Sequence, residues 1–216
     1  MKNKNILGHL QIIMSSSLFG LMPLFTKMAY SYGATPMTVA FCCCFYATII
    51  LALILPLMKK NIFSIERAQI IPMLKIAIPF GLIPVALFNA YTHLDSGMAT
   101  ILFYTHPIFV MLLSILMYRA FPSRKQIFCM ILCLVGIVLL NAIQEEIKVV
   151  GIAVAILAGF IYSIYVIACG QKGIEEIDPT VLSFWINLFA TIAVGIIGIV
   201  TGQLMIVTEP MGQLSM

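Results

Sequence analysis

The stretch GATPMTVAFCCCFYATI, residues 33–49, aligns without a gap with EIDPTVLSFWINLFATI, residues 176–192, when the sequence is shifted by 143 positions. The identical pairs are Pro36 with Pro179, Phe41 with Phe184, Ala47 with Ala190, Thr48 with Thr191 and Ile49 with Ile192. The same shift brings Gly8 onto Gly151 and Phe19 onto Tyr162. A shared frame over this length indicates an internal repeat.

The composition shows which solvent surrounds the repeat. The chain is 62% hydrophobic and only 9% charged, whereas soluble domains carry about 25% charged residues. Apolar runs long enough to cross a bilayer alternate with short polar links. We predict an all-α, polytopic membrane protein with about seven transmembrane helices packed as antiparallel neighbours. The predicted spans cover residues 7–30, 36–58, 70–91, 97–118, 126–143, 149–169 and 180–201.

The distribution of lysine and arginine predicts the orientation. If the N-terminus is cytoplasmic, nine of the twelve basic residues lie on the cytoplasmic side, as the positive-inside rule requires. These are Lys2, Lys4, Lys59, Lys60, Arg67, Arg119, Arg124, Lys125 and Lys172. We therefore predict a multi-pass protein of the cell membrane with a cytoplasmic N-terminus. The net charge of +4 reflects the cytosolic loops, and we expect no nucleic-acid partner.

The topology makes the repeat an inverted one. Its two copies are offset by five spans, and an odd offset reverses the direction in which the second copy enters the membrane. Inverted repeats are common in secondary transporters. We predict a complete five-helix repeat over residues 1–148 and an incomplete second repeat over residues 149–216. By this logic the chain is C-terminally truncated, because a complete pair would have ten spans.

Three stretches resemble the drug/metabolite transporter superfamily, in its EamA-like group. They are LFGLMPLFTKMAYSYGATP at residues 18–36, GMATILFYTHPIFVMLLSILMYRAFPSRKQIFCMILCLVGIVLL at residues 97–140, and GIAVAILAGFIYSIYVI at residues 151–167. The resemblance implies ten helices in two inverted five-helix repeats. The chain departs from the family pattern near Cys43, where members often carry an arginine, and near Ala120, where they often carry an acidic residue.

Polar residues inside the spans are the candidates for a substrate cavity, because polar groups at membrane depth usually face the bundle interior. Pro107 lacks a backbone donor and should free the carbonyl of Phe103. His106 beside it is a candidate cavity residue and the most plausible proton site, or else a histidine hydrogen-bonded within the helix packing. The remaining candidates for the cavity are Lys27, Asn89, Tyr104, Tyr162, Trp185 and Asn187.

Two of these candidates have an alternative interpretation. Lys27 could instead extend its amine to the outer interface, and Trp185 could be an anchor at the cytosolic interface. Two pairs of small residues at helical spacing, Ser16 with Gly20 and Ala155 with Gly159, are expected to mark close helix packing.

We predict a secondary transporter, an exporter, of small metabolites or drugs across the cell membrane. Its expected partners are membrane lipid and a small-molecule substrate. The sequence contains no P-loop motif, so nothing in it indicates ATP-driven transport. The alternative is a non-transporting remnant, or a subunit that needs a partner chain in a homo- or hetero-oligomer. We expect that the chain is not an enzyme and that it has no catalytic residue, metal or cofactor. A metal site built from His9, His93 and His106 is excluded, because a hydrocarbon core of about 30 Å separates the first two.

Overall fold

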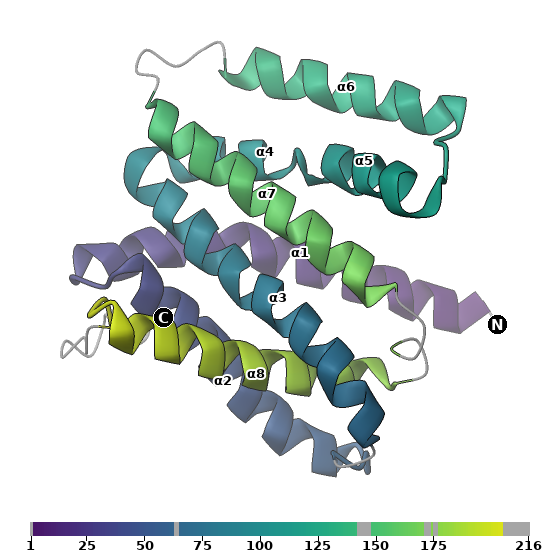
Figure 1. Ribbon diagram of the computed structural model, residues 1–216, viewed down its shortest axis with the longest axis vertical. Helices are drawn as coiled ribbons and strands as arrows, with labels where there is room; N and C mark the ends of the chain where they lie inside the picture. The colour runs from purple at the N-terminus through teal and green to yellow at the C-terminus, as the bar shows by residue number, and fades with distance from the viewer. Residues whose placement is uncertain (1, 63–64, 142–147, 171–173, 175–176, 205–216) are drawn as a thin grey trace.

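The structure is a computed structural model, and it describes residues 2–62, 65–141, 148–170, 174 and 177–204. Within these residues the chain forms helices and no strand, which confirms the predicted all-α fold (Figure 1). The helices are α1 (Lys2–Ser31), α2 (Pro36–Leu57), α3 (Arg67–His93), α4 (Ser96–Phe103), α5 (His106–Tyr118), α6 (Arg124–Asn141), α7 (Val149–Cys169) and α8 (Pro179–Val200).

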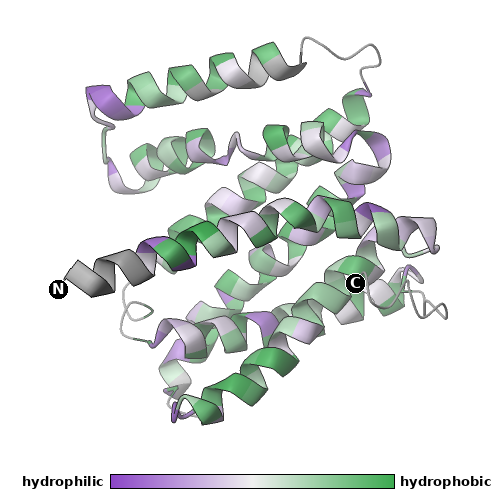
Figure 2. Ribbon diagram, turned by 180° about the vertical axis from the view of Figure 1, so that it is seen from behind, coloured by the Kyte–Doolittle hydropathy of each residue, from purple (hydrophilic) through white to green (hydrophobic). Residues whose placement is uncertain are grey.

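Six segments of the described chain are long and apolar enough, by length and composition, to cross a membrane. They match six of the predicted spans, and the expected fifth span, 126–143, is largely formed by α6. Many large apolar side chains on these helices are exposed. Figure 2 colours much of the ribbon of these helices green, as hydrophobic. Water would penalise that exposure, whereas lipid does not. The protein is therefore a polytopic all-α membrane protein.

The bounds of α2 and α8 differ by 143 residues at both ends. Each helix begins with a proline, whose missing N–H costs nothing in the first turn. Each is also capped by the preceding side chain: Thr35 accepts a hydrogen bond from the Thr38 N–H, and Asp178 accepts from the Thr180 and Val181 N–H groups. Local sequence thus sets the same limits for both helices.

The two helices pack against each other through equivalent contacts (Figure 1). Near the middle of the pair, the hydroxyl oxygens of Thr48 and Thr191 lie 3.5 Å apart. At one end the Thr35 hydroxyl donates to the carbonyl of Gln203, and at the other end Lys60 Nζ lies 2.8 Å from Asp178 Oδ1. Thr35 and Asp178 are repeat equivalents, and so are Lys60 and Gln203. These paired contacts support an inverted repeat, while its domain limits stay a prediction.

The predicted span at 97–118 matches the candidate span Ser96–Tyr118, but this segment is formed by two helices and not by one. α4 ends at Phe103 and α5 begins at His106, with Tyr104 and Thr105 between them. Pro107 lies in the first turn of α5, where its missing N–H is tolerated. The freed Phe103 carbonyl lies 3.2 Å from His106 Nδ1, so the histidine ring replaces the lost backbone donor.

The crossing of α3 and α7 forms the centre of the fold (Figure 1). Phe88 of α3 and Ala155 and Ala158 of α7 are fully buried in the largest apolar cluster. A Cβ atom on Gly159 would lie 2.8 Å from the Phe103 carbonyl oxygen, so the close packing expected at Ala155 and Gly159 is confirmed.

The same expectation for Ser16 and Gly20 is not confirmed. A Cβ atom on Gly20 would have no neighbouring atom within 4 Å, and Ser16 is exposed.

Candidate functional site

A central cavity of about 290 Å³ lies where α1, α2, α3, α4, α7 and α8 converge. Its lining is mostly aromatic and aliphatic. The lining residues are Phe19, Met22, Cys43, Cys44, Phe80, Ile83, Pro84, Leu87, Phe88, Phe103, Tyr162 and Asn187. Its position between helices of a bundle is where ligand sites form in such folds.

Polar groups are sparse in this cavity. Of the described residues that line it, Asn187 and Tyr162 are the strongest hydrogen-bonding groups, and none is charged. The amide nitrogen of Asn187 donates to the carbonyl of Ser183 at 2.8 Å, which leaves the amide oxygen as an acceptor for another donor. The site therefore suits an apolar or aromatic solute that is oriented by few hydrogen bonds.

Repeat-equivalent residues face this cavity from both copies. Phe19 of α1 and Tyr162 of α7 are 143 positions apart, and so are Cys44 of α2 and Asn187 of α8. Tyr162 and Asn187 could be predicted from the sequence because they are polar within spans, whereas their equivalents are less polar and resemble ordinary packing residues. Applying the 143-residue shift to the two selected residues would have identified Phe19 and Cys44.

The break between α4 and α5 lies beside the cavity. The His106 ring lies 4.5 Å from the Tyr162 ring and 5.3 Å from the Phe103 ring, both of which line the cavity. The Ser163 hydroxyl lies 3.0 Å from the carbonyl oxygen of His106, which fixes the break to α7. His106 thus has the hydrogen bond expected of a packing residue and also contacts the cavity wall, and its role as a proton site stays a prediction.

The other candidates from the sequence lie outside the cavity lining. Tyr104 is exposed at the helix break, and Pro107 lines a separate groove between α5 and α6. Asn89 is exposed on α3. Lys27 Nζ lies 3.5 Å from Asp95 Oδ1 at the predicted outer end.

Trp185 lies near the opposite end of the bundle. Its indole N–H donates to the carbonyl of Ile62 at 2.9 Å. The hydrogen bond satisfies the one polar group of the indole, and the ring packs against Phe184 and Phe189.

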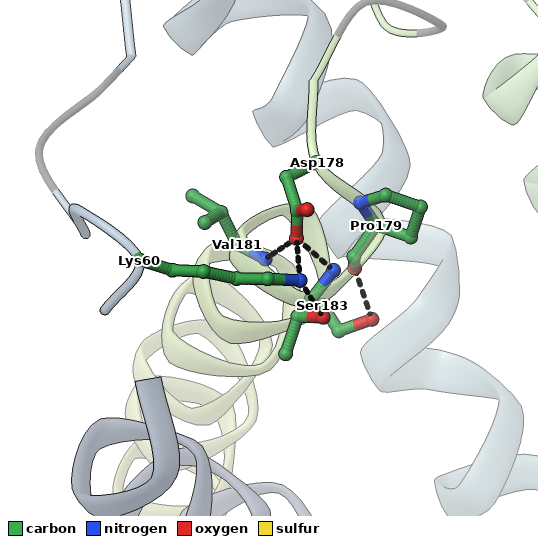
Figure 3. Close-up of polar contacts among 6 residues, drawn as sticks. Lys60, Asp178, Pro179, Val181 and Ser183 are labelled. Atoms are coloured by element: carbon green, nitrogen blue, oxygen red, sulfur yellow. Dashed lines mark hydrogen bonds and ion pairs between the residues drawn. The ribbon is translucent and has the colours of Figure 1, made fainter. Parts of the chain in front are cut away.

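A polar cluster joins α2 to α8 at the predicted cytosolic end (Figure 3). Lys60 Nζ lies 2.8 Å from Asp178 Oδ1 and 2.9 Å from the Thr180 hydroxyl oxygen. The hydrogen bond from Lys60 holds the pKa of Asp178 below its ordinary value, and the Thr180 and Val181 N–H groups lower it further. The same carboxylate therefore caps α8 and pairs with Lys60, three residues after the end of α2.

An all-α bundle of apolar helices around a central cavity defines a polytopic membrane protein. The sequence model of the EamA-like transporter family matches residues 6–142, which is well over half of the chain. The chain therefore belongs to the EamA-like transporter family, and it is a membrane transporter of small molecules. The comparisons with curated proteins and with solved structures gave no match.

Proposed function

We propose that this protein is a secondary transporter that exports small metabolites or drugs across the cell membrane, with the central cavity as its substrate site. The carrying observation is the lining of that cavity by equivalent residues of both copies, Phe19 with Tyr162 and Cys44 with Asn187. Alternating access needs a site between two inverted halves, so that each half can open in turn. The proposed orientation places the N-terminus in the cytoplasm.

The cavity also supports a substrate class. Aromatic walls without a charged lining residue favour neutral solutes that are largely apolar or aromatic. Its volume of about 290 Å³ lies at the lower limit of ligand pockets, which favours small molecules. Asn187 and Tyr162 would orient the substrate, and an ion gradient would drive the cycle. His106, in contact with Tyr162, is the proposed proton site.

A second proposal is that the chain works as a subunit with a partner chain. It is supported by the difference between α1 and α7, which are equivalent in the repeat. α7 packs against α3, α4 and α5, whereas α1 has few contacts and its Ile12 side chain is 66% exposed. A partner that supplies helices like α3, α4 and α5 would cover α1 and close the cavity on that side.

Transport in liposomes tests the first proposal. The purified chain is reconstituted with a panel of radiolabelled aromatic and aliphatic metabolites under an imposed proton gradient. Cys44→Phe should abolish uptake because it fills the cavity, whereas Cys42→Phe, two residues away and outside the lining, should retain it. Equal activity of the two variants would remove the cavity from the mechanism.

The partner proposal has its own readout. Co-expression of a separate chain with helices like α3, α4 and α5 should raise uptake above that of the single chain. Robust uptake by the purified monomer, with no increase on co-expression, would contradict it.

A further inference from the structure

A second groove, of about 570 Å³, runs between α5 and α6. Ile108, Met111 and Ser114 of α5 form one wall, and Cys129 and Met130 of α6 form the other. α6 lies at the edge of the bundle (Figure 1), and Leu116 and Phe121 beside the groove are about four-fifths exposed. The groove is therefore separate from the central cavity and borders the membrane.

One end of this groove is basic. Lys125 lines it, and Arg119 and Arg124 lie close by in the sequence. No acidic residue occurs between Ser96 and Asn141. Within the described part of the chain, the ion pairs are Lys27 with Asp95 and Lys60 with Asp178. The basic end of the groove thus lacks a carboxylate partner in that part of the chain.

We propose that this groove binds an anionic phospholipid. One acyl chain lies between α5 and α6, and the phosphate lies at Lys125 and Gln126, close to Arg119 and Arg124. An apolar channel with a basic end complements both parts of such a lipid, and basic pockets between transmembrane helices are known to hold anionic headgroups. Tyr118 and Phe121 are exposed where the headgroup region would lie, which suits aromatic side chains at the interface.

The test measures lipid retention, so it is independent of transport. The full chain is purified in mild detergent, supplied with equal amounts of phosphatidylglycerol and phosphatidylcholine of identical acyl chains, and analysed by native mass spectrometry. The wild type should retain phosphatidylglycerol preferentially. Lys125→Gln should lower that preference about fivefold, the usual effect of one basic residue near a membrane surface. Lys59→Gln, which removes the same charge from the α2–α3 loop, should leave the preference unchanged.

A second variant tests the acyl-chain part of the site. Ser114→Phe should fill the groove and reduce retention of both lipids, while circular dichroism and elution volume verify the fold. Equal retention of the two lipids by the wild type would overturn the proposal, as would equal effects of Lys125→Gln and Lys59→Gln. Retention that survives Ser114→Phe would also overturn it, and a protein chain found in the groove would identify a different occupant.

Discussion

The two copies of the repeat agree in their second helices, α2 and α8, and differ in the packing of their first helices, α1 and α7. α2 and α8 share their bounds, their proline starts and their capping pattern. α1 and α7 align in sequence, but other helices pack against α7 and leave much of α1 exposed. Gly151 and Gly159 of α7 are points of close approach, whereas a Cβ atom on Gly8, the equivalent of Gly151, would meet nothing within 4 Å.

The difference separates what local sequence decides from what packing decides. A proline and a capping side chain act within one helical turn, so they give the same result in either copy. Close approach needs a second helix, and α3, α4 and α5 supply it for α7. By the symmetry of the repeat, equivalent helices would cover α1, which is the physical basis for proposing a partner chain.

The largest expected effect is at Gly159. Gly159→Ala would bring a methyl group to 2.8 Å from the Phe103 carbonyl oxygen, and this backbone atom cannot rotate away. We expect a loss of about 2 kcal/mol in the free energy of unfolding, within the usual range for overpacking. Denaturant titration of the purified protein in bicelles would measure it.

Gly136→Ala is the matched control for Gly159→Ala, because a Cβ atom there meets nothing within 4 Å. Equal stability of the two variants would show that α7 does not pack closely against the helix break.

A smaller effect is expected where the repeat allows a direct comparison. In Gly151→Ala the new methyl group would lie 2.6 Å from Leu94 Cγ and 2.8 Å from His93 Cβ, so the backbone must shift there, and His93 and Leu94 lie at the end of α3, where the chain leaves the helix. We expect a loss of about 1 kcal/mol. Gly8→Ala, the same change at the equivalent site, should be neutral or stabilising, because alanine favours a helix.

Adding the proposed partner chain would test whether α1 becomes packed at Gly8 as α7 is packed at Gly151. If helices like α3 and α4 cover α1, Gly8→Ala should become as unfavourable as Gly151→Ala, measured as weaker association of the two chains. A Gly8→Ala variant that associates normally would argue against equivalent packing of α1.

Much of the fold could be predicted from the sequence, because membrane spans and caps are local signals. The predicted span at 149–169 has the limits of α7, and the predicted 36–58 differs from α2 by one residue. The break at Tyr104 and Thr105 was not predicted. Pro107 indicated a weakened helix, but the contact of α7 with the break involves residues more than 50 positions away.

The site was less predictable, for a physical reason. The candidates were chosen as polar residues within spans, whereas the cavity is lined mainly by aromatic and aliphatic side chains. Asn89 and Trp185 lie outside the lining: Asn89 is exposed on α3, and the indole N–H of Trp185 donates to the carbonyl of Ile62. Apolar lining residues such as Phe80 look like any other core residue until the helices are assembled.

A third prediction concerns a hydrogen bond that only the second copy has. The Ser163 hydroxyl shares its proton between the carbonyl oxygens of Gly159, at 2.8 Å, and His106, at 3.0 Å, whereas Gly20, the equivalent of Ser163 in α1, has no side chain to do so. Ser163→Ala should cost about 1 kcal/mol, the usual net value of one buried hydrogen bond. The loss should be seen in the same bicelle titration, and Ser183→Ala, on exposed α8 surface, should leave the stability unchanged.

The smallest effect is expected at the caps of α2 and α8, where the copies differ in charge: Thr35 is neutral and Asp178 is ionised. Because Lys60 lowers the pKa of Asp178, this pair stabilises the fold above the ordinary aspartate range, and the stabilisation is lost as the pH falls through the lowered pKa. Asp178→Asn keeps a good capping residue but removes the charge, so it should lose less stability at neutral pH than Ser163→Ala. It should also lack the acid-dependent step of the wild type.

Melting curves of both proteins between about pH 7 and about pH 3 would measure this difference, since that interval spans carboxyl titration. Parallel curves over the whole interval would show that the pair contributes nothing, and that the two caps are equivalent despite their charge.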